Sequence, residues 1–250
     1  EILRCLVGSE MCIRDRKNTA AQYFACGEAM YPQLLRDLER AEHTIFVEFF
    51  ILHTGKMWDG VEAILRRKAA QGVDVRLIYD DFGSLLGLPS DFVIRMEKAH
   101  IRCIPFNPVV PLVSLVMNHR DHRKIVVIDG RVGFFGGMNI ADRYVKGPGW
   151  GVWRDSHFKV EGKGVYGLQS AFLVDWSTVE RVHLDTSKFF PEADNYTSST
   201  MQFATSGPLG PWRTLLQGIM TAIAGARRSI CIQTPYFLPT EGLNSLLQTA

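Results

Sequence analysis

The sequence predicts an α/β fold in which helices flank a central mixed β-sheet. Short apolar runs alternate along the chain with segments whose apolar residues recur at helical spacing. The run Ile125–Ile128 is apolar and β-branched at every position, which is typical of a strand buried on both faces between two helical layers. With 250 residues, 46% of them hydrophobic, the chain can bury such a core, unlike a disordered or fibrous protein.

Helices and strands alternate from Leu34 onwards. Apolar residues at helical spacing predict helices at 34–41, 58–69, 92–98 and 164–179. Apolar or alternating runs predict strands at 44–52, 75–79, 101–104, 122–128, 132–135 and 153–160. Residues 181–200 are rich in loop formers, so we expect a first domain at residues 17–200 and a second unit at 201–250.

Residues 1–16 show no clear hydrophobic period. The stretch Cys5–Asp15 back-translates into a string that resembles the end of a sequencing-library adaptor, and Glu1–Arg4 fit its upstream primer. A natural tail would have to match that adaptor codon by codon. We therefore expect residues 1–16 to be non-native and exclude them from the fold argument, as for a fusion scar.

The chain begins to repeat itself after the expected boundary. The pattern of residues 41–48 recurs at 226–233, and the helical pattern of residues 60–65 recurs at 242–247. At equal spacing, a second copy of a motif near residue 122 would lie at about position 307. We therefore expect one complete repeat followed by the opening of a second.

Charge and cysteine content argue against several kinds of site. The net charge is +2 and the arginines are scattered, so no nucleic-acid partner is expected. The five cysteines form neither a Cys-x-x-Cys pair nor a cluster with zinc spacing, so we expect no metal, no cofactor and no disulfide framework. Asp80 and Asp81 are expected to form a turn or helix cap rather than a metal pair, because neighbours on a strand point to opposite faces.

A histidine and a lysine lie two positions apart where the chain enters the buried run. Because side chains alternate across a strand, His122 and Lys124 share a face and can reach one ligand, whereas Arg123 points the other way. Asp129 lies at the far end of the run, and we interpret it as structural support. A lone histidine or lysine would usually be structural, but the conjunction with the glycines and the amide donor that follow favours a phosphate site.

The stretch from His122 to Asn139, HRKIVVIDGRVGFFGGMN, resembles the HKD motif of the phospholipase D superfamily. Most members carry Gly-Ser where this chain has Gly136-Gly137, and the double glycine is typical of bacterial cardiolipin synthases. The flanking stretches FVEFFIL, GVDVRLIYDDFGS, WRDSHFKVEG and TPYFLPT agree with that branch, and the resemblance covers nearly all of residues 36–250.

This resemblance implies a phospholipase D-like layered sandwich, with one full repeat and the start of a second. It also implies a catalytic motif made of His122, Lys124 and Asp129, with phosphate contacts from Lys124, Gly137 and Asn139. Two such motifs meet in the superfamily, where one histidine forms a phosphohistidine and the other transfers protons. Lysines and asparagines neutralise the phosphate oxygens in place of a metal.

The implied activity is a phosphatidyl transfer between two phosphatidylglycerol molecules, which releases glycerol and gives cardiolipin. The implied location is the inner membrane with the catalytic domain on its cytoplasmic side, and the second motif would come from further chain or from a homodimer. No apolar run reaches the roughly 18 residues of a spanning helix. Other phosphodiesterases of the superfamily, which hydrolyse phospholipid or nucleic acid, and a non-catalytic binding half remain open alternatives.

Three further residues are expected to support the site. Asp155 shares a face with His157 and either holds His122 in its productive tautomer or pairs with a nearby arginine. Glu48 lies among apolar residues and should have a buried partner. The apolar stretch at 106–117 either packs in the core or contacts acyl chains or the bilayer.

Overall fold

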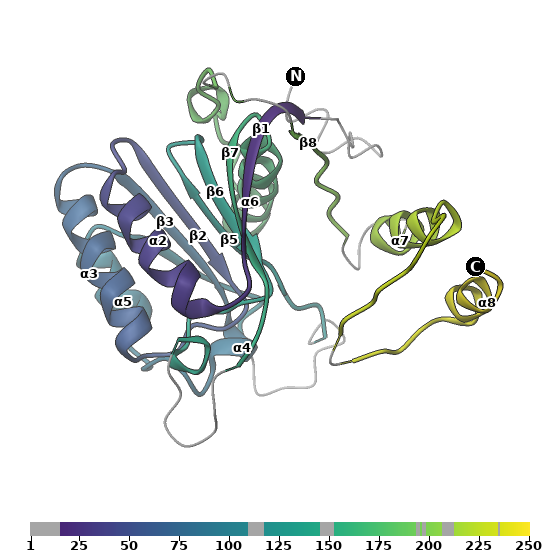
Figure 1. Cartoon of the computed structure of the whole chain (residues 1–250). Helices are drawn as coiled ribbons and strands as arrows, with labels where there is room; N and C mark the ends of the chain where they lie inside the picture. Colours follow the sequence, from purple (N-terminus) through teal and green to yellow (C-terminus); the bar gives the residue numbers. More distant parts are fainter. Residues whose placement is uncertain are drawn as a thin grey trace. The chain divides into compact units, whose positions relative to one another are not determined.

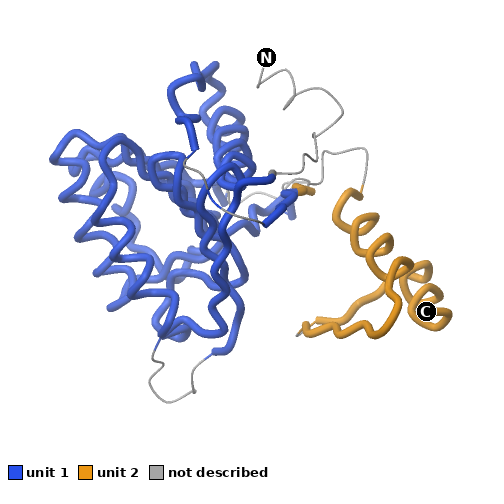
Figure 2. The backbone as a smooth tube through the Cα atoms, turned by 45° about the horizontal axis from the view of Figure 1, so that its top comes forward, with its two compact units in different colours: residues 1–203 blue, residues 204–250 orange. Residues whose placement is uncertain are grey.

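The computed structural model describes residues 16–109, 118–145, 153–193, 196, 199–206, 213–234 and 236–250. The chain divides into two compact units, residues 1–203 and 204–250 (Figure 2). The division therefore falls three residues after the boundary expected from the loop formers. Apart from Arg16, the segment expected to be non-native lies outside the described residues, as do residues 110–117 of the apolar stretch.

The first unit is built on one eight-stranded sheet with the order β4-β3-β2-β5-β6-β7-β1-β8. Its strands are β1 (Arg16–Phe24), β2 (Thr44–Phe49), β3 (Asp74–Asp80), β4 (Arg102–Phe106), β5 (Lys124–Ile128), β6 (Val132–Gly136), β7 (His157–Gly162) and β8 (Ser199–Met201). Strands β2, β3 and β4 are parallel, whereas every other neighbouring pair is antiparallel. The predicted mixed sheet is confirmed.

Helices cover both faces of this sheet. One face carries α2 (Gly27–Glu39), α3 (Lys56–Ala70) and α5 (Phe92–Glu97), and the other carries α6 (Val165–Glu180) (Figure 1). The short elements are α4 (Asp81–Ser84), η1 (Asp142–Tyr144) and η2 (Ser187–Phe189). The predicted α/β layered sandwich is therefore present.

Alternation along the central strands supplies two separate cores. Val126 and Ile128 of β5 pack with the three helices on one face, while Ile125 and Val127 pack with α6 on the other. The run of β-branched residues needed no polar position because neither face of β5 meets water. The prediction of a strand buried on both faces is confirmed.

A two-residue turn joins β5 to β6. Asp129 and Gly130 have φ angles of 52° and 63°, and Arg131 N donates to Ile128 O at 3.0 Å. Two positive φ angles at Asp-Gly are typical of a type I′ hairpin turn, whose twist matches that of the flanking strands.

Three of the differences from the expected elements concern the strands that carry the motif end of the sheet. Strand β5 begins at Lys124, so His122 precedes the strand rather than lying on it. Strand β7 begins at His157, and the described residues before it are irregular. Strand β1 was not predicted, because its polar residues hide the strand pattern and its contacts are with β7 and β8, more than a hundred residues away.

The second unit contains α7 (Thr214–Ala224) and α8 (Glu241–Thr249). Helix α8 occupies the position expected from the internal repeat. The described residues of 226–233 are not a strand, in contrast to residues 44–49, because no described strand pairs with them and a strand needs a ladder partner. Among the described helices of both units, none is long and apolar enough to cross a membrane.

Candidate active site

The motif residues gather at one end of the sheet, where β2 ends and β5 begins. Phe49 is paired with Lys124 across these two antiparallel strands. The next residue is Phe50, and the centroid of its ring lies 4.7 Å from the centroid of the His122 ring. Lys124 Nζ lies 5.1 Å from the same Phe50 centroid. Phe50 is therefore the apolar surface against which the histidine and the lysine are placed together.

Lys124 is a buried cation. Its side chain is only 4% exposed, and Nζ donates a hydrogen bond of 2.6 Å to the backbone oxygen of His122. Burial lowers the pKa of Lys124 to about 8, although the nearby carboxylates of Asp121, Asp155 and Asp80 favour the charged form. An ammonium that is poorly solvated in this way gains free energy when an anion such as a phosphate reaches it.

His122 presents its ring to solvent beside this cation. Partial burial and the charge of Lys124 lower the pKa of His122, whereas Asp121, Asp80 and Asp155 raise it to a smaller extent. The imidazole is therefore neutral near pH 7 and carries a lone pair that can attack phosphorus or accept a proton. Asp155 is close enough to act on its pKa, but no hydrogen bond joins the two side chains.

The double glycine makes room for a carboxylate rather than exposing its amides. Gly137 N donates to Ser156 O at 2.9 Å, and the expected phosphate contact of this residue stays a prediction. A Cβ on Gly137 would lie 2.1 Å from Asp155 Oδ1, and one on Gly136 would lie 2.7 Å from His157 Nδ1. The glycines thus let Asp155 and His157 approach the end of β6.

His157 is a buried neutral imidazole. It is 1% exposed, its Nδ1 has no hydrogen-bond partner, and burial together with the charge of Lys124 lowers its pKa to about 3. Its position beside Lys124 agrees with the expectation that it supports the site. Asp155 forms none of the ion pairs found among the described residues, and Arg120 is instead within ion-pair distance of Asp80.

Both polar atoms of the Asn139 side chain form hydrogen bonds within the protein. Its Oδ1 accepts a hydrogen bond from Ile51 N at 2.9 Å, and its Nδ2 donates to the Tyr144 hydroxyl at 3.2 Å. The residue is 4% exposed. These contacts tie the loop after β6 to the segment after β2, and the expected phosphate contact of Asn139 stays a prediction.

Asp129 is not brought to this group. It lies in the hairpin turn at the opposite end of β5, and its carboxylate accepts hydrogen bonds of 2.9, 2.7 and 2.7 Å from the amides of Glu42, His43 and Thr44. Asp129 and Lys124 therefore lie at opposite ends of β5, and the expected catalytic role of Asp129 stays a prediction. The interpretation as structural support agrees with these bonds, which anchor the start of β2.

Glu48 has a partner on the α6 face of the sheet, as expected. Its carboxylate is fully buried and lies 3.6 Å from Arg123 Nη1, and Arg123 also pairs with Asp175 of α6. Burial, followed by the charge of Asp121, raises the pKa of Glu48 well above its usual value, although Arg123 opposes this. Arg123 points away from Lys124, as the strand alternation predicted.

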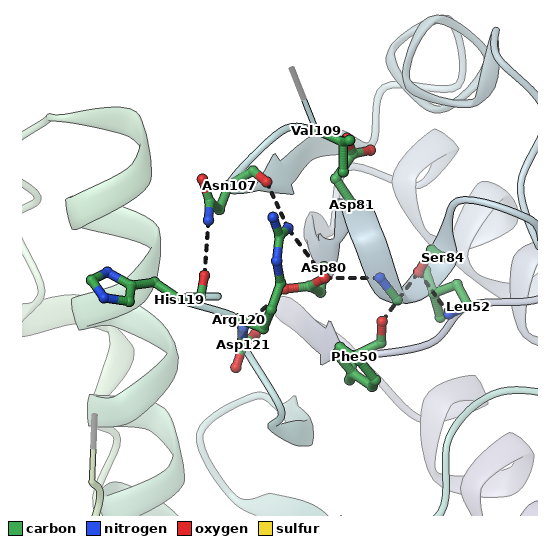
Figure 3. Close-up of polar contacts among 11 residues, drawn as sticks. Phe50, Leu52, Asp80, Asp81, Ser84, Asn107, Val109, His119, Arg120 and Asp121 are labelled. Carbon is green, nitrogen blue, oxygen red and sulfur yellow. Dashed lines mark hydrogen bonds and ion pairs between the residues drawn. The ribbon is translucent and has the colours of Figure 1, made fainter. Parts of the chain in front are cut away.

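Asp80 fixes the segment that leads into the motif. Its carboxylate accepts hydrogen bonds of 2.9 Å from both Gly83 N and Asp121 N, and Arg120 Nη1 lies 3.6 Å from Oδ1 (Figure 3). The bond to Gly83 is the cap of α4, so the expected capping role is confirmed. Sequence reasoning missed the contact with Asp121 because the two aspartates are 41 residues apart.

Phe50, Asp121 and Arg123 were also missed as contributors to the site. The run HRDHR, a dense group of charges directly before an apolar strand, is the signal that would have indicated charged groups on both sides of His122. No cluster of three or more histidine, cysteine, aspartate or glutamate side chains that could hold a metal ion occurs in the described part of the chain.

Comparison with known proteins places this arrangement in a family. Residues 34–148 match the family model described as "Cardiolipin synthase, PLD-like domain". A cardiolipin synthase of Listeria innocua is 34% identical to this chain over 94% of the chain and 49% of its own length. The chain belongs to the phospholipase D superfamily. Cardiolipin synthase 2 of Staphylococcus epidermidis is likewise 34% identical, over 90% of the chain and 46% of its own length.

This phospholipase D-like chain spans about half the length of the curated relatives it matches. Among solved structures, phosphatidylserine synthase of Haemophilus influenzae superposes with a TM-score of 0.64 at 14% identity, over 92% of this chain and 58% of that one. At this identity the likeness concerns the fold alone, and it agrees with the layered sandwich described above.

Proposed function

We propose that the chain supplies one half of the catalytic site of a phosphatidyltransferase, which makes cardiolipin from two phosphatidylglycerol molecules and releases glycerol. The observation that carries this proposal is the buried ammonium of Lys124, fixed beside a neutral His122 at an accessible end of the sheet. The similarity to cardiolipin synthases supports a phospholipid as the phosphodiester.

His122 performs one of two roles in this reaction. As the nucleophile, its ring nitrogen attacks phosphorus, the bond from phosphorus to the departing glycerol oxygen breaks, and that oxygen takes a proton from an acid. The hydroxyl of a second phosphatidylglycerol then attacks the phosphohistidine and gives up its proton, and the imidazole leaves. As the acid and base, His122 would give a proton to the departing glycerol oxygen in the first step and take the proton of the incoming hydroxyl in the second.

Lys124 neutralises charge on the non-bridging phosphate oxygens as the transition state forms. Asp155, held close by the missing side chain of Gly137, stabilises the imidazolium form of His122. Lys124 is the first residue of β5, and Asp155 lies two residues before β7, so the central sheet positions both groups.

A complete cycle needs a second acid–base group opposite His122. We propose that it comes from a second HKD motif, either further along the protein or in a second copy of this chain. On this proposal, the 250-residue chain alone forms at most one covalent adduct per histidine and turns over slowly or not at all.

The test uses phosphatidylglycerol labelled with ³²P at the phosphodiester. The chain is quenched in denaturant within seconds, and protein-bound label is assayed for the acid lability and base stability of a phosphorus–nitrogen bond. If His122 is the nucleophile, label appears on the wild-type chain, disappears in His122→Asn and falls on the order of a hundredfold in Lys124→Met, within the range of single catalytic groups. His43→Asn, at an exposed position on no motif, is the matched control.

The products separate the alternatives. Cardiolipin and glycerol from the chain or its dimer support the transferase, whereas phosphatidic acid identifies water as the acceptor and a hydrolase. Cardiolipin formation without label on His122 assigns it the acid–base role. Binding of phosphatidylglycerol with neither label nor product would contradict catalysis by this half.

A further inference from the structure

The turn that follows β3 has its polar side inward and its apolar side outward. Phe82 and Leu85 are each 54% exposed and Leu86 is 96% exposed. Ser84, the polar residue between them, is buried at 1% exposure. Isolated apolar residues are common on protein surfaces, but three in one turn of five residues form a protruding apolar tip.

This tip is held rigidly by hydrogen bonds to the body of the fold. Leu52 N donates to Ser84 Oγ at 3.0 Å, and the Ser84 hydroxyl donates to Phe50 O at 3.3 Å (Figure 3). Thr54 N donates to Gly87 O at 2.9 Å. The outward direction of the leucines is therefore part of the folded structure and is not a frayed loop end.

Two glycines four residues apart allow the turn to lie flush against the segment after β2. A Cβ on Gly83 would lie 2.3 Å from Phe50 O, and a Cβ on Gly87 would lie 2.4 Å from Leu52 O. Neither position has room for a side chain. The close approach fixes which face of the turn is inward. On the outward face the Arg120 guanidinium lies 5.3 Å from the centroid of the Phe82 ring, and Leu85 and Leu86 stay exposed.

The apolar tip is next to the candidate active site. Phe50, which accepts the Ser84 hydroxyl through its backbone oxygen, contacts His122 and Lys124 through its ring. An exposed tryptophan, Trp153, stacks under the Arg143 guanidinium at 4.6 Å and contacts Tyr144, which reaches the same end of the sheet through Asn139. Tryptophan and arginine are typical of the boundary between lipid headgroups and hydrocarbon.

We propose that Phe82, Leu85 and Leu86 form a membrane-contact turn, which inserts into the surface of a phospholipid bilayer and brings a lipid phosphate to His122 and Lys124. The proposal rests on the proposed function, because it takes a phospholipid as the substrate. In a phospholipid the phosphate lies only a few bonds from the acyl chains. At this end of the sheet, Lys124 and the apolar turn are likewise close, because Phe50 contacts Lys124 through its ring and Ser84 of the turn through its backbone oxygen.

A bilayer fits this tip better than a folded partner does. A protein partner would need a shaped pocket for each protruding side chain, whereas a fluid hydrocarbon layer takes up a convex apolar tip without one. Cations at this end, including the Arg143 guanidinium beside Trp153, complement the negative charge of phosphatidylglycerol.

The test measures sedimentation of the 250-residue chain with large vesicles of phosphatidylglycerol and phosphatidylcholine in equal parts. The double variant Leu85→Ser with Leu86→Ser should weaken the partition into vesicles by about tenfold or more, since each inserted leucine contributes apolar transfer free energy. Ile94→Ser is the matched control, because Ile94 is also 54% exposed but lies on α5. It should change the partition less than about twofold.

A second measurement locates the turn in the bilayer. Leu86→Trp and Ile94→Trp variants are compared in vesicles of brominated phosphatidylglycerol, and bromine should quench the added tryptophan only at position 86. Unchanged partition of the double variant, or no extra quenching at position 86 in vesicle-bound protein, would overturn the proposal. So would a loss of self-association in the double variant with vesicle binding unchanged, which would mean that a second copy of the chain covers the tip.

The outcome is distinguishable from failure of the proposed function. Short-chain phosphatidylglycerol below its micelle concentration reaches the site without a bilayer. Labelling of His122 by this soluble lipid, in wild type and double variant alike, together with unaltered vesicle partition, would disprove the membrane contact and leave the chemistry standing. Weakened vesicle partition of the double variant, without labelling of His122 by the soluble lipid, would support the membrane contact and contradict the proposed chemistry.

Discussion

Lys124 carries its charge where little water can solvate it, and its pKa of about 8 places its titration within an accessible range. Because the cation is present below that pKa and lost above it, anion binding should weaken as the pH rises. Between pH 7 and pH 9 the protonated fraction falls about tenfold, so we expect the affinity for sulfate to fall by a similar factor.

Titration calorimetry with sulfate measures this effect, because sulfate keeps its own charge across this range. Lys124→Met should bind weakly at both pH values. Lys124→Arg keeps its cation at pH 9 and should lose the pH dependence. The same fall in affinity in Lys124→Arg would assign the titration to another group.

Gly137 controls the position of Asp155. In Gly137→Ala the added methyl group takes the place of the Asp155 carboxylate, which is 2.1 Å from that point, and the carboxylate must swing away. Asp155 raises the pKa of His122, so the variant should have a lower His122 pKa by nuclear magnetic resonance titration. Asp155→Asn should give a shift in the same direction, and an unchanged His122 pKa in both variants would contradict the contact.

Glu48 makes stability depend on pH. Its pKa in the folded protein is raised above the unfolded value of about 4.5 by burial, so its favourable contribution is complete below that value and is lost as the pH rises. Glu48→Gln cannot ionise. The free energy of unfolding of the variant should therefore rise relative to that of the wild type between pH 5 and pH 8, by about 1.4 kcal/mol per unit of pKa shift.

Urea unfolding at several pH values checks this expectation. Glu180→Gln, at an exposed position of α6, is the control for the loss of one carboxylate. A constant difference between Glu48→Gln and wild type would mean that Arg123 stabilises the carboxylate enough to offset its burial.

The hairpin of β5 and β6 is the element that holds the motif strand in register. Asp129→Ala removes the acceptor of three backbone amides at the start of β2 and leaves them without partners. We expect a loss of about 2–3 kcal/mol in the free energy of unfolding. Sulfate affinity at 10 °C, where the variant stays folded, should match the wild type, whereas a specific loss of affinity would support a direct role for Asp129.

Local patterns predicted most elements of this fold. The central strands and the long helices were predicted because their apolar periodicity is contained within each segment. Strand β1 was missed because its strand character depends on distant partners, and the start of β7 was placed too early because residues 153–156 alternate without a ladder. The spacing of His122 and Lys124 was enough to predict that the two side chains lie together. The hydrogen bond from Gly137 N to Ser156 O joins residues that are far apart in the sequence, so no local pattern indicates it.

At the scale of the whole first unit, the polar chemistry and the exposed apolar turn share one end of the sheet, and the hairpin anchor lies at the other end. The chain spans about half the length of the curated relatives it matches. The candidate active site thus lies at one end of the sheet, and the hydrogen bonds of Asp129 that anchor β2 lie at the opposite end.

The strand pairings also determine when the site can exist. Lys124 is paired with Phe49, and His157 is paired with both Gly136 and Phe24, so the end of the sheet that carries the motif joins residues from early and late in the unit. Contacts of such large sequence separation form slowly, after the local hairpin. The proposed phosphate site should therefore be absent while only the first half of the unit has left the ribosome, and it should form only once β7 has emerged.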